Sequence, residues 1–519
     1  MYLTQALKRA VQVNGGGVAT HDHGRQRTWT ECADRVAKLA GALQALGIRD
    51  GERAAILALN SDRYFEYFYA VPWAGGVFVP VNTRLAPPEI AYWLNDSGSR
   101  VLFIDDAFLG AWQALDGQLE TVEHVVYLGD GATPEGTLNY EEILAAADPL
   151  EDAQRGYDDL AGIFYTGGTT GKSKGVMLSH RNLVCNSLNV IPSFNFKPGL
   201  RWLHAAPMFH IADGLSVFGV TMVVGEHYFI PAFTPEASLE ALEKHRITTG
   251  LFVPTMVNML VHHPGVEKVD LSNLETIAYG ASPMPEAVIL RAMEVIPNCR
   301  FHHAYGQTEC APLVSQCGPE YHVVDGPNAG RFKSAGKAVL GVEVRIFDAD
   351  DNEVPRGTVG EICVRGPNVM LGYWNKPEET AAALRGGWMH SGDGGYMDEE
   401  GFIYVVDRVK DMIISGGENV YSAEVEDAVY QHPAVAECAV IGVPDEKWGE
   451  AVHAIVRVKD GESLTEADLI AHCHKLIAGF KCPRGVSFRD DPMPLSGAGK
   501  ILKTELRKPY WEGRDKQVN

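Results

Sequence analysis

The sequence is poor in the features that mark secreted, zinc-binding or redox proteins. Its 519 residues include nine cysteines, an odd number, and no two of them have C-x-x-C spacing. Scattered cysteines of this kind suit a reducing cytoplasm better than a disulfide framework. The group Cys299, His302, His303, Cys310 and Cys317 matches no common ligand spacing, so we expect no zinc site there.

Long apolar runs and an excess of positive charge are also missing. The longest weakly polar segment, residues 214–225, is too short to cross a bilayer and indicates a buried helix. Residues 1–13 have no apolar core after Lys8 and Arg9, so we expect no signal peptide. The 45 basic and 67 acidic residues give a formal net charge of -22, which disfavours nucleic acid and anionic membranes as partners. We therefore expect a cytoplasmic protein without a membrane span.

What the sequence does contain is alternating strand and helix patterns, which predict an α/β fold. One series runs from residue 30 to about 160 and a second from 202 to about 296, so we expect two α/β layers with parallel sheets. Short alternating strands at 342–346 and 361–364 indicate a small β-barrel or sheet appended to them. The predicted strands of the two layers are 54–59, 77–81, 101–104, 125–128, 202–206, 228–230, 250–253 and 276–279, and the predicted helices are 33–43, 63–73, 87–94, 211–224, 235–245, 255–263 and 285–296.

The pattern changes once more near residues 407–410. A compact α+β pattern follows, with a helix from about Ser422, strands at 434–443 and 451–458, and a helix that starts at Thr465. We therefore predict a large N-terminal domain of residues 1–408 and a small, mobile α+β C-terminal domain of residues 409–519.

The most informative stretch is residues 165–176, which read Y-T-G-G-T-T-G-K-S-K-G-V. Between Thr166 and Gly175 every residue is Gly, Thr, Ser or Lys, a composition that lets backbone N–H groups and hydroxyls approach an anion while lysines neutralise it. Apolar triplets at 163–165 and 176–178 place this segment between two strands. We interpret it as a phosphate-binding loop.

Three other interpretations of this loop were weighed. A Walker loop requires glycine where Thr166 stands. The G-x-S-x-G pattern at residues 171–175 would need a helix after it, whereas a strand is predicted. A flexible hairpin without a ligand fits the loop alone but leaves the motifs below without an explanation.

Four further stretches carry polar groups that could bind a ligand or take part in a reaction. Residues 304–309 end in Glu309, a lone carboxylate that suits Mg2+ beside phosphates. Residues 390–393 end in Asp393, whose carboxylate could accept bonds from ribose hydroxyls. Residues 407–419 combine fixed positive charge with a pliable Gly-Gly backbone, and residues 494–500 place Lys500 on a glycine-rich loop. Each is weak alone.

Taken in order, and over essentially the whole chain, these stretches resemble the adenylate-forming superfamily of acyl-CoA synthetases, luciferases and peptide-synthetase adenylation domains. The likeness is greatest to the fatty-acid and aryl-acid CoA ligases. The resemblance implies that a carboxylate attacks the α-phosphate of Mg-ATP to give an acyl-adenylate and pyrophosphate. The thiol of coenzyme A, the co-substrate, then displaces AMP and forms a thioester.

The resemblance also implies roles for particular residues. Lys500 would bridge the carboxylate and α-phosphate oxygens, Thr308 would contact the α-phosphate, and Glu309 would bind Mg2+. Lys410 would be the hinge between the domains, and proline there should impair only the second step. The ATP site would comprise Thr166, Gly167, Gly168, Thr169, Thr170, Gly171, Lys174, Ala281, Ser282, Pro283, Tyr305, Gly306, Gln307, Thr308, Asp393, Arg408 and Lys500; the acyl pocket His210, Gly280 and His303; and the CoA site Gly416, Gly417 and Glu418.

The sequence departs from the commonest pattern of this superfamily at several positions. Glycine replaces serine at Gly167, serine replaces proline at Ser173, and histidine stands at His303 where glutamine is frequent. The apolar residues around His210 suggest that the substrate is a medium or long fatty acid. An aryl acid is the alternative substrate, and a carrier-protein thiol is the alternative acceptor. Asp213 is expected to cap a helix, and a homodimer is one assembly consistent with the superfamily.

Overall fold

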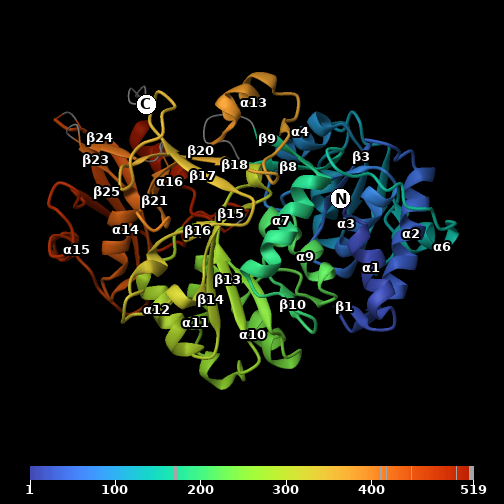
Figure 1. The fold of residues 1–519 in the computed structure, drawn as a ribbon, viewed down its shortest axis with the longest axis horizontal. Helices are drawn as coiled ribbons and strands as arrows, with labels where there is room; N and C mark the ends of the chain where they lie inside the picture. The colour runs from blue at the N-terminus through green and yellow to red at the C-terminus, as the bar shows by residue number, and fades with distance from the viewer. Residues whose placement is uncertain (167–172, 409–411, 416–417, 446, 498, 513–519) are drawn as a thin grey trace.

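The protein is described here by a computed structural model, which covers residues 1–166, 173–408, 412–415, 418–445, 447–497 and 499–512 (Figure 1). Four β-sheets organise these described residues. Two large sheets with their helices build the body of the molecule, a small antiparallel sheet adjoins them, and a fourth sheet belongs to the C-terminal part. The mixed α/β fold agrees with the prediction.

The first sheet is mainly parallel and has the strand order β19-β9-β8-β4-β3-β5-β6-β7. Its strand β8 turns back into β9 as an antiparallel hairpin, in which Thr166 pairs with Lys174. The glycine-rich residues therefore join two strands, as predicted. The strands are β3 (Arg53–Leu57), β4 (Val77–Pro80), β5 (Ser99–Ile104), β6 (His124–Tyr127), β7 (Leu138–Asn139), β8 (Leu160–Thr166), β9 (Lys174–Ser179) and β19 (Gly372–Tyr373), and the helices along this part of the chain are α2 (Trp29–Ala45), α3 (Asp62–Trp73), α4 (Pro87–Ser97), α5 (Leu109–Gln113) and α6 (Tyr140–Ala146).

The second sheet has the order β16-β15-β14-β13-β12-β10-β11-β1-β2. Strands β10 to β14 pair in parallel, so their carboxyl ends lie along one edge. The strands are β1 (Val18–Asp22), β2 (Arg25–Thr28), β10 (Arg201–His204), β11 (Glu226–Phe229), β12 (Thr249–Phe252), β13 (Thr276–Gly280), β14 (Arg300–Gly306), β15 (Leu313–Cys317) and β16 (Lys337–Ala338), and the helices along this part of the chain are α1 (Gln5–Asn14), α7 (His180–Ser193), α8 (Ile211–Gly214), α9 (Ser216–Met222), α10 (Pro235–Lys244), α11 (Pro254–Val261) and α12 (Glu286–Val295).

Two sequence expectations are corrected here. Strands β1 and β2 belong to the second sheet, where β1 pairs in parallel with β11, so the start of the chain does not build the first layer alone. The single helix expected over 211–224 is two helices, α8 and α9, which meet at Leu215. Gly214 immediately precedes that break, and glycine is a poor helix former.

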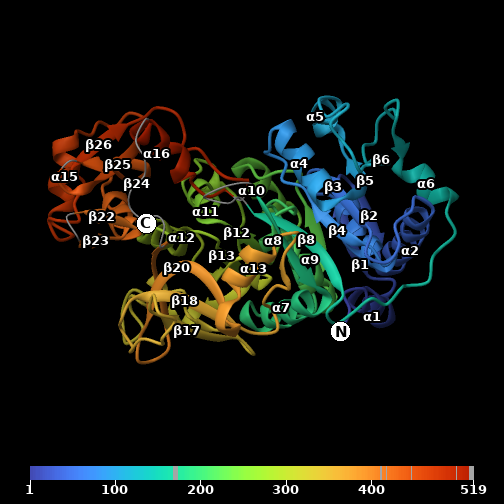
Figure 2. The same ribbon diagram turned by 90° about the horizontal axis from the view of Figure 1, so that it is seen from above.

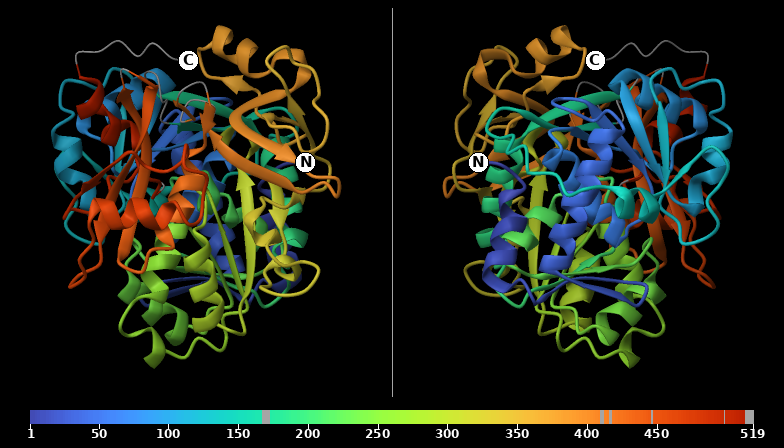
Figure 3. Two further views of the ribbon diagram at one scale, coloured as in Figure 1. Left: turned by 90° about the vertical axis from the view of Figure 1, so that its left-hand side faces the viewer. Right: turned by 90° about the vertical axis from the view of Figure 1, so that its right-hand side faces the viewer.

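The third sheet is antiparallel, with the order β17-β18-β20-β21, and confirms the small β unit predicted between residues 336 and 407. In Figure 3 the orange segment that contains α13 lies at the opposite end of the molecule from the green helices. The elements are β17 (Glu343–Phe347), β18 (Gly360–Arg365), α13 (Pro377–Ala383), β20 (Met389–Met397) and β21 (Ile403–Arg408).

The fourth sheet is built entirely from residues after 412. Its order is β23-β22-β25-β24, with β26 pairing in parallel with β25, and it has a core of its own around Val440 and Val452. Figure 2 shows this part beside the second sheet, and the red segment that leads into α16 extends toward α10 and α11. Its elements are β22 (Ile413–Ser415), β23 (Glu418–Val420), α14 (Ser422–Tyr430), β24 (Val435–Asp445), β25 (Gly449–Val458), α15 (Glu466–Cys473), β26 (Gly485–Phe488) and α16 (Lys503–Trp511).

None of the helices within the described ranges is both long and apolar enough to cross a membrane.

Candidate active site

The candidate site lies where the parallel strands of the second sheet end. The carboxyl ends of parallel strands share one edge of a sheet, and ligands bind there in open α/β folds. Of the predicted residues, His210 follows β10, Ala281 follows β13, and Thr308 follows β14. The topology of the sheet therefore gathers residues that are up to about a hundred positions apart.

Backbone packing fixes two glycines at this edge. A Cβ atom on Gly280 would lie 2.1 Å from the carbonyl oxygen of Ala304, the residue paired with it on β14. A Cβ atom on Gly306 would lie 1.8 Å from the carbonyl oxygen of Pro312. Both positions thus require glycine, and the space at Gly280 is filled by protein. Ala281 next to it has φ 71, a left-handed conformation that is unfavourable for alanine and is found most often at functional sites.

Tyr305 and Asp393, which are 88 positions apart, meet at this edge. The Tyr305 hydroxyl donates to Asp393 Oδ2 at 2.8 Å. Burial, with the neighbouring Asp393 carboxylate, raises the pKa of Tyr305 well above its ordinary value. The Asp393 backbone N–H donates to Ser391 Oγ at 3.0 Å. The structure therefore joins the residue predicted for adenine to the one predicted for ribose.

Glu309 lies in the short turn after β14 and is only 9% exposed. One of its carboxylate oxygens, Oε1, accepts a hydrogen bond from the Tyr373 hydroxyl at 2.9 Å. The Lys174 ammonium lies 4.9 Å from the centre of the Tyr373 ring. Through Tyr373, the predicted metal ligand is thus adjacent to the end of the predicted phosphate loop.

This arrangement fits a magnesium ion held between the protein and a polyphosphate. Mg2+ prefers one or two carboxylates together with phosphate oxygens and water, and Glu309 supplies one carboxylate next to the phosphate loop. The Tyr373 hydroxyl orients that carboxylate, as partners of metal ligands commonly do.

His210 begins α8, where its Nδ1 atom accepts the backbone N–H of Ala212 at 3.3 Å. That bond assigns the ring proton to Nε2. Burial, and the nearby ammonium group of Lys500, lower the pKa of His210 to about 3. The imidazole is therefore neutral at physiological pH.

The loop that carries His210 is held by Asn60, which sequence reasoning did not identify. The Asn60 amide donates to the carbonyl oxygens of His204 and Ala206, and its Oδ1 accepts the backbone N–H of Met208 at 2.8 Å. The only signal for this role in the sequence was an asparagine directly after a predicted strand. Tyr373 was also missed, because its role depends on Glu309, which is remote in sequence.

Asp213 does not cap a helix, and His303 packs against a tyrosine. The His303 ring stacks on Tyr279 with centroids 5.0 Å apart, and its Nδ1 atom bonds to the carbonyl oxygen of Ser334. Packing accounts for these contacts, and its assignment to the acyl pocket stays a prediction. Asp213 instead accepts from Trp202 Nε1 at 3.0 Å and bonds to His204 Nδ1 at 2.9 Å.

Eight residues of the predicted site lie outside the described residues, and the side chains of two more are not described. The former are residues 167–171, Lys410, Gly416 and Gly417, and the latter are Arg408 and Glu418. On the backbone, Arg408 pairs with Asp393 between β21 and β20. Ser282 and Pro283 follow the end of β13, and Gln307 follows the end of β14.

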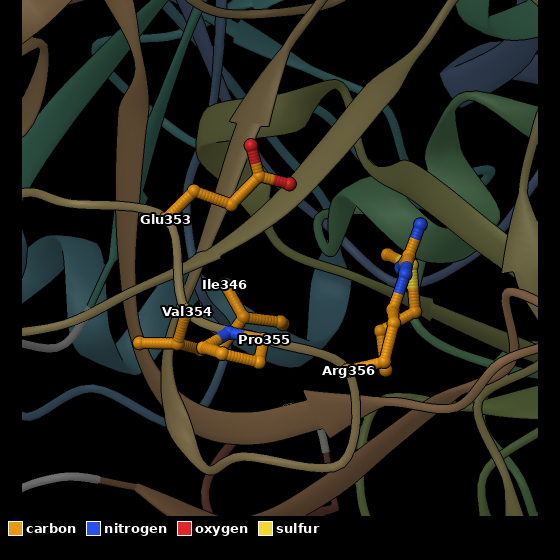
Figure 4. A pocket seen from close by; sticks show the side chains of 6 residues that line it. Ile346, Glu353, Val354, Pro355 and Arg356 are labelled. Atoms are coloured by element: carbon orange, nitrogen blue, oxygen red, sulfur yellow. The ribbon is translucent and has the colours of Figure 1, made fainter.

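A separate small pocket of about 210 Å³ lies on the third sheet. Figure 4 shows Ile346, Val354 and Pro355 along it, with the side chains of Glu353 and Arg356 well apart. No predicted site residue lines this pocket, so we assign it no part in the chemistry.

Comparison with known proteins shows the family of this chain. A family described as AMP-binding enzyme matches residues 7–374, and its C-terminal domain matches residues 424–500. The chain is 40% identical to Feruloyl-CoA synthase from Amycolatopsis sp, over 97% of this chain and 98% of that one. It is 35% identical to Fatty acid--[acyl-carrier-protein] ligase ScoC from Streptomyces coeruleorubidus, over 96% and 94%. The crystal structure of ATP-bound MatB from Rhodopseudomonas palustris has 31% identity and a TM-score of 0.88, over 99% of both chains.

Proposed function

The chain belongs to the AMP-binding enzyme family, and from this premise we propose that it is an ATP-dependent acyl-CoA synthetase. It would first convert a carboxylic acid and ATP into an acyl-adenylate and pyrophosphate, and then form a thioester with CoA. The resemblance drawn from the motifs is confirmed at the level of the family, and a relative named as a CoA synthase supports the ligase activity.

The observation that carries this proposal is the position of Lys500. It comes from the C-terminal part of the chain, yet the loop that carries it contacts the end of β12, where Thr255 Oγ1 donates to the carbonyl oxygen of Gly499 at 3.3 Å. A carboxylate and a triphosphate repel each other, so their reaction needs fixed positive charge more than it needs a base. Lys500 supplies such a charge at the edge of the second sheet.

In the proposed first step, a carboxylate oxygen forms a bond to the α-phosphorus, and the bond from that phosphorus to the pyrophosphate oxygen breaks. Lys500 stabilises the charge that gathers between the carboxylate and the phosphate. Lys174 and the loop before it bind the outer phosphates, and Asp393 with Tyr305 orients the nucleoside. Glu309 would hold Mg2+, which neutralises the charge of the leaving pyrophosphate.

In the proposed second step, the CoA sulfur attacks the acyl carbon, and the bond from that carbon to the AMP oxygen breaks. The resemblance assigns Gly416, Gly417 and Glu418 to CoA and Lys410 to a hinge between residues 1–408 and 409–519. The His210 imidazole remains neutral, so it adds no charge that would compete with Lys500 for the adenylate.

For the acid itself we propose a carboxylic acid with a large apolar body. Met208, Phe209 and Ile211 are buried around His210, which suits an apolar substrate. A relative named for the aryl acid ferulate and one named for fatty acids, at 40% and 35% identity, support both classes. The fatty acid preferred from the sequence therefore stands beside an aryl acid as an equal candidate.

The test is pyrophosphate release from Mg-ATP with short, medium and long fatty acids, and with ferulate and other aryl acids. Each acid is assayed with and without CoA, and the products are identified by mass spectrometry. We expect acyl-CoA and AMP only when CoA is present. The absence of acid-dependent pyrophosphate release with the whole panel would contradict the proposal.

A carrier protein is the second candidate acceptor, because the ScoC relative is named as an acyl-carrier-protein ligase. In that case an acyl-adenylate would accumulate unchanged in the presence of CoA. Adding a holo acyl-carrier protein to the same assay would then consume the adenylate.

A further inference from the structure

The loop that carries Lys500 is bound to the N-terminal part of the chain at two points. Arg84, which lies after β4, donates from Nη1 to the carbonyl oxygen of Ser496 at 2.8 Å. Thr255, in the first turn of α11, donates from Oγ1 to the carbonyl oxygen of Gly499 at 3.3 Å. The two acceptors lie one and four residues before Lys500, so these bonds fix the backbone that presents the ammonium group.

The surfaces between these two points are in close contact. A Cβ atom on Gly497 would lie 2.4 Å from the Asn82 side chain. Gly499 has φ +78, and a Cβ atom on it would lie 3.1 Å from Val253 Cγ2. The loop thus lies directly on the ends of β4 and β12. Within the loop, the Lys500 backbone N–H donates to Ser496 Oγ at 3.1 Å, which couples Ser496 to the lysine.

A third contact joins the same two parts of the chain at a distance from the loop. Asp427, on α14 of the C-terminal part, accepts the backbone N–H of Glu286 at 3.3 Å through Oδ1. Glu286 is the first residue of α12, where a helix favours negative charge. Lys333, which pairs with Glu286 at 2.7 Å, adds a positive charge beside it. Burial, and in part the charge of Glu286, raises the pKa of Asp427.

We propose that Arg84, Thr255 and Asp427 are positioning residues, which hold the C-terminal part of the chain against the N-terminal part so that the Lys500 loop stays on the ends of β4 and β12. Arg84 and Thr255 bond to backbone carbonyl oxygens of the lysine loop, and Asp427 joins the same two parts of the chain at a distance from that loop. Their effect on the reaction is therefore exerted through Lys500. This inference rests on the proposed function, in which Lys500 serves the first of two steps.

We expect substitutions at these residues to slow the first half-reaction more than the second. The first is acid-dependent pyrophosphate release without CoA, and the second is acyl-CoA formation from supplied acyl-adenylate and CoA. Arg84→Ala and Asp427→Ala should each slow the first about tenfold, the scale of one lost hydrogen bond to a charged group. Each should slow the second less than twofold. Thr255→Val should have a smaller effect in the same direction, because its hydrogen bond is longer and uncharged.

A double-mutant cycle separates positioning from a general structural role. If Arg84 acts through Lys500, then Arg84→Ala should cause no further loss of adenylation in a Lys500→Ala background. Asp468→Ala is the matched control, because the Asp468 carboxylate accepts a hydrogen bond from the Thr465 hydroxyl at a helix start inside the C-terminal part. It should leave the ratio of the two half-reaction rates unchanged.

Thermal unfolding confirms that each variant is folded, and Arg84→Lys and Asp427→Asn replace any variant that is not. Equal losses in both half-reactions, or additive losses with Lys500→Ala, would overturn the positioning roles. A wild-type chain that forms no acyl-adenylate from any acid would instead overturn the proposed function, so the two failures are distinguishable.

Discussion

Two regions of this molecule are held by hydrogen bonds of polar side chains, one buried under a sheet and the other between two parts of the chain. Beneath the second sheet, Asp213 bonds to Trp202 and His204, and His204 continues to His227 at 3.0 Å. All of these side chains are buried within one sheet and its helices. Around Lys500, by contrast, Arg84 and Thr255 bond to backbone carbonyls across the boundary between two parts of the chain.

The difference indicates what each region contributes. A buried polar group that loses its partner cannot form hydrogen bonds with water instead. We therefore expect the Asp213 network to contribute to the free energy of unfolding. The Arg84 bond is exposed to solvent and the Thr255 bond is only partly buried, so we expect their loss to cost less stability and to alter where one ammonium group stands. We therefore expect mutations in the first region to unfold the protein and mutations in the second to slow its reaction.

The largest expected effect on stability comes from Asp213→Ala. Trp202 Nε1 and His204 Nδ1 would lose their buried partner, and each buried donor left unsatisfied costs about 1–3 kcal/mol. The free energy of unfolding, measured by chemical denaturation, should fall by that amount.

Glu236→Ala provides the matched control for Asp213→Ala. Glu236 also bonds to a histidine, with His263 Nε2 at 3.1 Å, but its side chain is 70% exposed. Its removal should change the free energy of unfolding by less than about 1 kcal/mol. Equal effects at the two positions would contradict the contrast between the two regions.

Lys500→Ala should have the largest effect on catalysis. The loss of one preorganised electrostatic donor slows a reaction by about 10²–10³, and we expect that loss in acid-dependent pyrophosphate release. The unfolding temperature should stay close to that of the wild type. Thioester formation from supplied acyl-adenylate should slow less, and an equal loss in both steps would argue against the role given to Lys500.

Tyr373→Phe tests the link between Glu309 and the phosphate loop. Without the hydroxyl, Glu309 Oε1 loses its donor, and a hydrogen bond to a charged group is worth about 1.5–3 kcal/mol. Adenylation should slow about tenfold, and more Mg2+ should be needed for half-maximal activity in a Mg2+ titration.

The control for this substitution is Tyr228→Phe. Tyr228 also donates to a carboxylate, Glu226 Oε2 at 2.6 Å, but on a strand outside the predicted site. An unchanged Mg2+ requirement in Tyr373→Phe, or the same increase in both variants, would remove the link between Glu309 and Mg2+.

The smallest expected effect is on the pH dependence of stability. Burial lowers the pKa of His180, His302 and His322 to about 4. Between pH 4 and 6.5 the unfolded chain therefore binds protons that these folded histidines do not, so stability rises with pH across that window. Asp105 opposes this, because burial raises its pKa to about 6, and the raised pKa of Asp427 acts in the same direction. The lowered pKa of His210 adds to the effect of the three histidines.

Thermal unfolding between pH 4 and 7 measures this effect. The unfolding temperature should rise by several degrees and level off above pH 6.5, since 1 kcal/mol shifts it by about 2–4 °C in domains of 150–250 residues. Replacing His322 by Gln should flatten the curve, whereas a profile that falls from pH 4 to 6.5 would contradict the neutral buried state of these histidines.

Much of the fold followed from local patterns. Strand β4 (Val77–Pro80) is buried on both faces and reads as a continuous apolar run, so a parallel sheet could be predicted from it. The small third sheet was visible because its strands alternate in polarity. The assignment of β1 to the second sheet was not visible, because no local signal specifies a partner some two hundred residues away.

The sequence by itself determined the chemical inventory of this protein. The glycine, threonine and lysine content of residues 165–176, with Glu309, Asp393 and Lys500 in order, indicated the family, because composition and order along a chain are properties of the sequence alone. Only the tertiary structure decided which of these groups meet. The bond from Tyr373 to Glu309, the bond from Met208 to Asn60 and the bond from Thr255 to the Lys500 loop depend on how separate parts of the chain pack, and packing joins residues that share no local pattern.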